Sequence, residues 1–133
     1  MKIQRDYSRS QEDFCEALLM LEQEGKPLET TLVAKMLGIS KPAVHQMGHE
    51  LIDRGLITRK DYGDMKLTDK GRELAEKVLA RHHVLKECLL RLGVSEDLAE
   101  KDCCEIEHVI SEETFDCIKN FVEKMRKKKQ NRL

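Results

Sequence analysis

Apolar side chains recur every three or four positions along most of this 133-residue chain, which is the spacing of amphipathic helices. The first such stretch predicts a helix over residues 11–24, with Ser10 as its N-cap and an inward apolar stripe that begins at Phe14. Gly25 and Pro27 follow this stretch and are expected to end the helix.

Two further helices are predicted in the stretches TTLVAKMLG and KPAVHQMGHELIDRG, separated by a turn at Gly38. Ser40 is expected to cap the second of them, and Pro42 suits its first turn. LITRK and MKLTD, separated by DYGD, then predict a two-stranded hairpin. Two short helices followed by a hairpin are typical of a winged helix–turn–helix. Ala34 and Val44 match its pattern, because a small residue lets the helices approach and a branched one locks the second helix.

The second half of the chain predicts helices only. One covers residues 70–92, and Ser95 caps another over residues 96–109. Ser111 caps the last one, whose basic end, residues 124–133, is expected to fray. The inward positions of the first of these helices are Val78, His82, Leu85, Leu89 and Leu92, and those of the last are Phe115, Ile118, Val122 and Met125.

The predicted fold class is therefore mainly α, with a winged helix–turn–helix in residues 1–72 and an all-helical domain in residues 73–133. No apolar run approaches the roughly 20 residues that span a bilayer, and the N-terminus lacks the apolar core of a signal peptide. Five cysteines, an odd number, favour a reducing compartment over structural disulfides. We therefore expect a cytoplasmic protein with no membrane partner.

The helix after Ser40 has the chemistry of a DNA-reading helix. Gln46 can pair with an adenine edge, and Pro42 and Ala43 can pack on thymine methyl groups. Because the formal net charge is only −1, any DNA contact requires a local patch. The candidate positions on this helix are Lys41, Pro42, Ala43, His45, Gln46 and His49, and the candidate phosphate contacts near the hairpin are Arg54, Arg59, Lys60 and Lys66. The alternative is a winged fold that contacts only other proteins.

The stretch DCCEIEHVIS concentrates thiols, carboxylates and an imidazole. If it is helical, Cys104, Glu107 and His108 share one face, a donor set that suits a divalent transition metal. Cys103 would point about 100° away, toward the apolar side, and would pack. Since no CxxC pair is present, the pattern is not that of a zinc finger.

Three ligands leave a coordination sphere incomplete, so we expect other helices to contribute. Asp13 and Glu16 lie three residues apart and off the apolar stripe of the first helix, whereas His82 lies on an apolar stripe. Taken singly, each has an ordinary explanation: Asp13 could complete a capping box with Ser10, Glu16 could be a solvated carboxylate, and His82 could be a core histidine. Together with the cysteine-containing cluster they favour a metal site.

The motifs SQEDFCEALLMLEQEG, LGISKPAVHQM, LTDKG, RHHVLKECL and CCEIEHVIS, in this order, resemble the diphtheria-toxin-repressor and manganese-transport-regulator family of metal-dependent repressors. The resemblance implies a homodimer in which metal binds between a winged helix and a helical dimerisation domain. It places the base-reading positions on Pro42 and Gln46, near Ser40. The metal ligands that it implies are Asp13, Glu16, His82, Cys104, Glu107 and His108.

The implied ligand set mixes two branches of that family. Asp13 and Glu16 resemble the manganese branch, whereas Cys104 resembles the iron branch. A thiolate favours softer ions than Mn(II), so Fe(II) is expected first and Mn(II) next. Cys104 replaces a bridging glutamate of the manganese branch, which disfavours a two-metal site. Lys86 stands where the iron branch has a glutamate of an ancillary site, so that site is expected to be missing or altered. The SH3-like domain of the larger iron-responsive members is expected to be absent.

The predicted function is that of a metal-activated repressor of metal-uptake genes, with operator DNA and a second copy of the chain as partners. We expect no enzymatic activity and no organic substrate, because no pocket-forming loop or spare general base accompanies the ligands. The main alternative is a thiol-based redox-sensing winged-helix regulator that uses Cys103 and Cys104, or Cys15. A winged-helix regulator with an organic effector also stays open.

Overall fold

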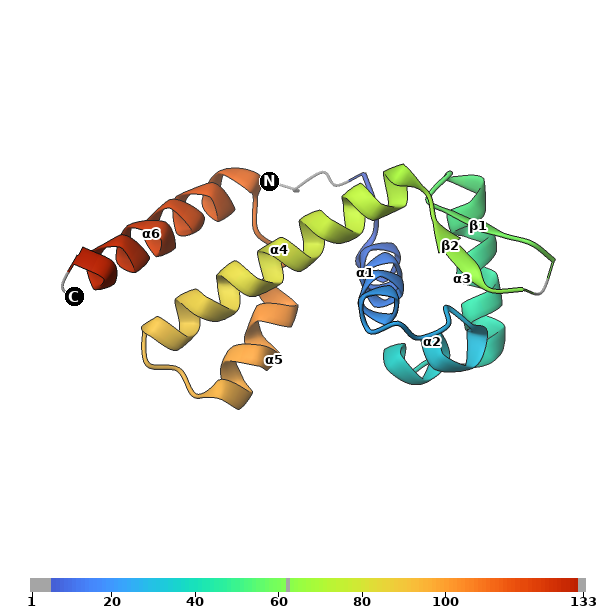
Figure 1. Ribbon diagram of the computed structural model, residues 1–133, viewed down its shortest axis with the longest axis horizontal. Helices are drawn as coiled ribbons and strands as arrows, with labels where there is room; N and C mark the ends of the chain where they lie inside the picture. Colours follow the sequence, from blue (N-terminus) through green and yellow to red (C-terminus); the bar gives the residue numbers. More distant parts are fainter. Residues whose placement is uncertain (1–5, 62, 132–133) are drawn as a thin grey trace. The chain divides into compact units, whose positions relative to one another are not determined.

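The computed structural model describes residues 6–61 and 63–131, with side chains up to residue 128. This part of the chain forms six helices and one two-stranded sheet (Figure 1). It divides into two compact units inside one helix, between Val78 and Leu79. We call Asp6–Val78 the winged-helix unit and the part that follows the helical unit. A functional boundary after residue 72 stays a prediction.

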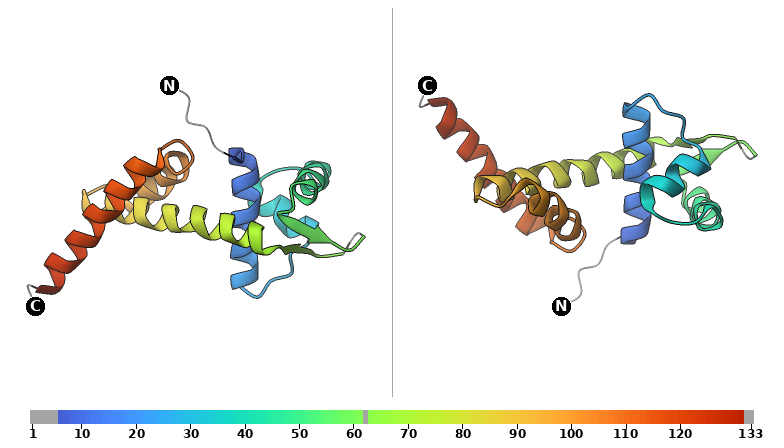
Figure 2. Two further views of the ribbon diagram at one scale, coloured as in Figure 1. Left: turned by 90° about the horizontal axis from the view of Figure 1, so that it is seen from above. Right: turned by 90° about the horizontal axis from the view of Figure 1, so that it is seen from below.

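The winged-helix unit has the predicted order of elements: helix, two short helices and a hairpin. Ile57 pairs with Leu67 and Arg59 with Met65 in the antiparallel sheet. In both views of Figure 2 the green hairpin projects beyond the three helices. The elements are α1 (Arg9–Gln23), α2 (Thr30–Leu37), α3 (Lys41–Asp53), β1 (Ile57–Arg59) and β2 (Met65–Leu67).

The first turn of α1 corrects one prediction. The N-cap is Ser8, whose Oγ accepts a hydrogen bond from the Gln11 backbone N–H at 3.2 Å. The Gln11 side chain in turn accepts from the Ser8 N–H at 3.1 Å, which completes a capping box. The prediction of Ser10 as N-cap was wrong, because only the pair three residues apart that begins at Ser8 satisfies both backbone donors. A capping role for Asp13 is excluded with it.

The helix–turn–helix itself was predicted correctly. Gly38 ends α2 in the left-handed conformation, with φ of 66°, which residues with a side chain rarely adopt. Ser40 caps α3 by accepting from the Ala43 N–H at 3.2 Å, and Pro42 lies in the first turn. Val44 and Leu51 are fully buried and fix α3 against the core. These contacts hold α3, which we call the recognition helix of the helix–turn–helix, against the core.

A close backbone approach joins the hairpin to α4 (Asp69–Arg91). Thr68 Oγ1 donates to the Gly55 carbonyl at 2.7 Å and accepts from the Gly71 N–H at 3.1 Å. A Cβ atom at position 71 would lie 1.9 Å from the Leu56 carbonyl oxygen, so this position requires glycine. The motif LTDKG therefore encodes the junction between the wing and α4.

The helical unit contains the rest of α4, then α5 (Glu96–Ile106) and α6 (Glu112–Asn131), drawn from yellow to red in Figure 1. α5 ends three residues before the predicted end at residue 109, so the stretch DCCEIEHVIS is only partly helical. α6 continues to Asn131, so the basic segment is helical up to that residue, and its last two residues lie outside the described part of the chain. Fraying of this end stays a prediction. Ser111 caps α6 as predicted, accepting from the Thr114 N–H at 3.1 Å.

The predicted inward stripes hold in part, because Leu89 of α4 and Phe115, Ile118 and Met125 of α6 are only half-buried. Val78 and Leu85 on α4 and Val122 on α6 are buried. Leu92 is 68% exposed, since α4 ends at Arg91 and its periodicity no longer applies one residue later. The stripe prediction was therefore wrong for Leu92.

Candidate metal centre and DNA-binding surface

His82 extends from α4 to α5 between two carboxylates. Its Nδ1 lies 3.1 Å from Glu107 Oε2, and its Nε2 lies 3.1 Å from Glu100 Oε1. The His82 side chain is only 12% exposed. Both ring nitrogens can donate at once only in the imidazolium form, which is the form that balances two carboxylates. A metal ion at this ring would take the place of a proton.

Glu107 is 2% exposed and lies between two imidazoles. Its second oxygen, Oε1, is 3.3 Å from His108 Nε2. Burial acts to raise the pKa of Glu107, but hydrogen bonds from His108 and His82 outweigh it and leave the pKa below its ordinary value. The carboxylate is therefore a buried anion.

Glu107 and His108 do not occupy the regular helical face that the sequence predicted, because α5 ends at Ile106. Glu107 is the C-cap and His108 lies in the turn that follows. The turn still brings Glu107 between the two histidines. An anionic carboxylate between imidazoles fits the donor preferences of a divalent transition metal.

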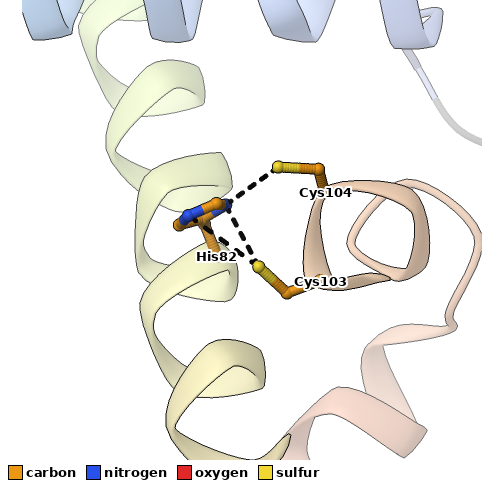
Figure 3. A group of neighbouring side chains, drawn as sticks. All are labelled: His82, Cys103 and Cys104. Atoms are coloured by element: carbon orange, nitrogen blue, oxygen red, sulfur yellow. Dashed lines mark hydrogen bonds between the residues drawn. The ribbon is translucent and has the colours of Figure 1, made fainter. Parts of the chain in front are cut away.

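The twin cysteines both approach His82, as Figure 3 shows. Cys103 Sγ lies 3.6 Å from His82 Nδ1 and 3.8 Å from Nε2, and Cys104 Sγ lies 3.8 Å from Nδ1. Cys103 is fully buried, which confirms its predicted burial, and that burial raises the pKa of its thiol to about 12. Its prediction as a packing residue was nevertheless incomplete, because its sulfur also lies beside the candidate ligand His82.

Glu100 and Lys86 belong to the same neighbourhood, and sequence reasoning missed Glu100. Lys86 Nζ lies 2.9 Å from Glu100 Oε2 and 3.0 Å from Glu96 Oε1. The hydrogen bond from Lys86 is the main reason that the pKa of Glu100 is lowered. The signal that could have identified Glu100 is its spacing of one helical turn before Cys104.

Asp13 and Glu16 lie one turn apart on α1 and are both partly buried. Asp13 Oδ2 lies 3.8 Å from Arg9 Nε. Asp13 also lines a pocket of about 360 Å³ between α1 and α3, together with Ala43 and Gln46. That Asp13 and Glu16 join the ligands of the helical unit stays a prediction.

The recognition helix presents the predicted polar positions. The side chains of Ser40, Lys41, Pro42, Gln46 and His49 are exposed, whereas Ala43 and His45 are half-buried. Lys60 and Lys66 are exposed beside and on the wing. An exposed polar helix with lysines nearby is accessible to a DNA groove and its phosphates.

Two arginines near the wing are already engaged within the winged-helix unit. Arg59 donates from Nη2 to Thr30 Oγ1 at 2.7 Å and from Nε to the Gly63 carbonyl at 2.8 Å, and its Nη1 lies 3.2 Å from His45 Nδ1. Arg54 lies over the Tyr7 ring, 4.3 Å from its centroid. Arg59 therefore connects α2, α3 and the wing through its side-chain contacts. Its contact with a DNA phosphate stays a prediction.

Comparison with protein families accounts for nearly the whole chain. Residues 6–65 match the model described as iron dependent repressor, N-terminal DNA binding domain. Residues 68–132 match the iron dependent repressor, metal binding and dimerisation domain. The chain belongs to the iron-dependent repressor family. It is accordingly a metal-dependent, DNA-binding transcriptional repressor of the diphtheria-toxin-repressor and MntR type, and not an enzyme.

Relatives in this repressor family come from archaea and bacteria. An uncharacterized HTH-type transcriptional regulator of Methanocaldococcus jannaschii is 36% identical over 123 residues, which cover 91% of this chain and 98% of that protein. The transcriptional regulator MntR of Escherichia coli is 34% identical over 113 residues, or 85% of this chain and 73% of MntR. The family predicted from the sequence is thereby confirmed. The comparisons do not support the alternative of a thiol-based redox sensor.

Solved structures share the fold. A manganese-dependent transcriptional repressor in complex with manganese has a TM-score of 0.78 at 23% identity, over 85% of this chain and 52% of that one. A hypothetical protein from Sulfolobus solfataricus has a TM-score of 0.69 at 22% identity, over 89% of this chain and 91% of that one. The chain thus spans about half the length of the manganese-dependent repressor. The predicted mainly helical winged fold is confirmed. No helix in the described residues could cross a membrane.

Proposed function

We propose that one divalent transition metal per chain activates this repressor for binding to the operators of metal-uptake genes. The observation that carries the proposal is Glu107, a buried anion between His82 and His108. Buried in this way, the carboxylate is stabilised by the two imidazoles, and a metal ion ligated by both of them would take the place of their protons as its cationic partner. The proposed ligands are Asp13, Glu16, His82, Cys104, Glu107 and His108.

The proposed ligands come from both units of the chain. Asp13 and Glu16 are one turn apart on α1, so both carboxylates can reach one ion. When bound, the metal supplies a positive centre that links α1 to the helical unit. Holding α1 also affects the recognition helix, because Asp13 shares a pocket with Ala43 and Gln46 of α3. When α1 is ordered before DNA binds, the entropy cost of DNA binding is lower. By linkage, bound DNA raises the affinity for metal by the same factor by which metal raises the affinity for DNA.

The proposed activating ion is Fe(II), with Mn(II) next. Cys104 supplies a thiolate, which favours Fe(II) over Mn(II). The relatives named MntR and the manganese complex of a repressor with the same fold support Mn(II). A single ion is favoured, because the Lys86 ammonium already neutralises Glu96 and Glu100 beside His82.

DNA recognition is proposed to follow the exposed surface of α3 and the wing. Gln46 and Pro42, near Ser40, would read bases together with Lys41, Ala43 and His45, while Arg59, Lys60 and Lys66 would hold phosphates. Exposed apolar side chains on the helical unit support a homodimer, which would read two half-sites. These side chains are Leu92, Leu98, Val109 and Phe121.

The deciding experiment measures operator affinity at fixed salt. A duplex is selected from random DNA with the metal-loaded full chain, and its affinity is then measured with Fe(II), Mn(II), Co(II), Zn(II) or a chelator. We expect the chelator to reduce affinity to the nonspecific level and Fe(II) or Mn(II) to restore it. Equal affinity with chelator and with every metal would refute the proposal.

A further inference from the structure

A second group of potential ligands lies wholly within the helical unit. One nitrogen of His82 and the sulfurs of Cys103 and Cys104 all lie within 4.8 Å of one another. Each sulfur is 3.6–3.8 Å from a ring nitrogen. In a tetrahedral zinc site, bonds of about 2.3 Å to sulfur and 2.0–2.1 Å to nitrogen place those two atoms about 3.6 Å apart. The distances of 3.6–3.8 Å between each sulfur and a ring nitrogen of His82 already match the sulfur–nitrogen distance of such a site.

We propose that His82, Cys103 and Cys104 form a site for a thiophilic divalent cation, Zn(II) or Cd(II), distinct from the activating ligand set. Two thiolates and one imidazole are the donors that such ions prefer over carboxylates. In Figure 3 both sulfurs point from α5 toward the imidazole of His82. Cys103, which the activating set does not use, is the residue that defines this site.

The binding step balances by proton exchange. The cation forms two metal–sulfur bonds and one bond to a ring nitrogen of His82, and three protons leave to solvent, one from each thiol and one from the His82 imidazolium. The thiol of Cys103 now donates to the Glu100 carbonyl at 3.2 Å, and that hydrogen bond is lost. Glu100 Oε1, 4.0 Å from Cys104 Sγ, can fill the fourth position.

The two sites exclude each other, because both require His82 and Cys104. An ion held by Cys103, Cys104 and His82 lies within one unit and uses neither Asp13 nor Glu16. Such an ion therefore occupies the protein without linking α1 to the helical unit. Zinc and cadmium then act as antagonists of activation, a consequence that rests on the proposed function, whereas the site itself does not.

X-ray absorption on the unaltered full chain loaded with one equivalent of Cd(II) or Zn(II) counts the sulfur ligands. We expect two sulfurs per ion. A count of one would overturn the inference, because the activating set contains only one thiolate. This measurement needs no variant and is therefore unaffected by any folding defect.

Replacing the defining cysteine tests the site directly. Cys103→Ser should weaken Cd(II) binding by more than about 100-fold, since losing even an outer-shell partner typically costs about 10- to 100-fold. The control Cys117→Ser removes an exposed thiol of α6 and should leave Cd(II) affinity unchanged. Equal Cd(II) affinity of the two variants would overturn the inference.

Variants on α1 separate this inference from the proposed function. Asp13→Ala and Glu16→Ala should keep the Cd(II) affinity of the unaltered chain while losing metal-dependent operator binding. If Cd(II) affinity falls in these variants, cadmium uses the activating set and the inference is refuted. If operator binding of the unaltered chain ignores Fe(II) and Mn(II), the proposed function fails, while the two-sulfur count still stands.

Discussion

The two units of this repressor bury different kinds of side chain. The winged-helix unit encloses an apolar core around Phe14, Leu18 and Leu51, all fully buried. In the described part of the helical unit, the buried set includes Glu107 and His108, while Leu92, Leu98, Val109 and Phe121 are exposed. The winged-helix unit has the larger apolar core, whereas the helical unit buries fewer apolar side chains, among them Leu85 and Val122, and adds a buried carboxylate and imidazole.

Because of this difference, we expect the folding stability of the winged-helix unit not to depend on metal, and that of the helical unit to depend on it. A DNA-reading unit with an apolar core can keep its shape in every metal state. A helical unit with ionised groups inside gains stability when a ligand binds, by about 2.7 kcal/mol at a free concentration 100 times the dissociation constant. Substitutions in each unit test this division.

The largest expected effect lies in the apolar core. Leu51→Ala should lower the free energy of unfolding by about 3–5 kcal/mol, because it removes a fully buried side chain and leaves a cavity. Its neighbour Ile52 is 38% exposed, so Ile52→Ala should cost much less. Denaturant unfolding without metal measures both. Similar losses in the two variants would mean that the core is not where the structure places it.

The next effect concerns the helical unit and should appear in metal binding instead. Glu107→Gln keeps the shape of the side chain but removes the buried anion, so we expect Fe(II) or Mn(II) affinity to fall by about 100-fold or more, about 2.7 kcal/mol. The control is Glu105→Gln, at an exposed position two residues earlier, in the last turn of α5. Calorimetric titration gives both affinities. Equal affinities would remove Glu107 from the ligand set.

A pair of glycine substitutions tests the junction of wing and α4. Gly71→Ala should destabilise the winged-helix unit by about 1–3 kcal/mol, because the new Cβ would collide with the Leu56 carbonyl oxygen. Gly48 lies in α3, where a new Cβ atom would meet no other element within 4 Å, so Gly48→Ala should stabilise by about 0.5–1 kcal/mol. Thermal unfolding of both variants should shift in opposite directions. A shift of the same sign would contradict the close approach.

The smallest effect concerns the exposed ion pair between Glu87 of α4 and Arg126 of α6. The hydrogen bond from Arg126 lowers the pKa of Glu87 from 4.5 to about 2. A lowered carboxyl pKa stabilises the fold above pH 4.5, and the stabilisation disappears as pH falls toward 2. Arg126→Ala should therefore melt slightly below the unaltered chain at pH 6, with the difference shrinking only below about pH 4.

The control for this ion pair is Lys127→Ala, which removes an exposed neighbouring charge. It should melt like the unaltered chain throughout this pH range. A difference between the unaltered chain and Arg126→Ala that persists unchanged to pH 2 would contradict the assigned cause.

The elements of both units could be predicted from the sequence because each is specified locally. Apolar periodicity, Gly38 and Ser40 define the helix–turn–helix without knowledge of any distant residue. The errors at Ser10 and Leu92 are one or two residues from a helix end, where competing caps decide. The candidate ligands His82, Cys104, Glu107 and His108 were found through chemistry and resemblance, and the structure brings them close to one another through His82 and Glu107.

What the sequence did not reveal depends on contacts between distant segments. The requirement for glycine at position 71 comes from a carbonyl of Leu56, 15 positions earlier. The approach of Cys103 to His82 depends on how α5 packs on α4, and a helical wheel of α5 alone turns that sulfur toward the apolar side. Glu100 was missed because its partners, Lys86 and His82, lie on another helix.

The three contacts of Arg59 have a consequence for how this sequence can change in evolution. Thr30 begins α2, His45 lies on the recognition helix and Gly63 lies in the wing, and one guanidinium connects them. A change at Thr30 or His45 alone would leave Arg59 with unmatched donors. Positions 30, 45 and 59 should therefore covary among descendants of this gene, and operator preference should change when the trio changes together.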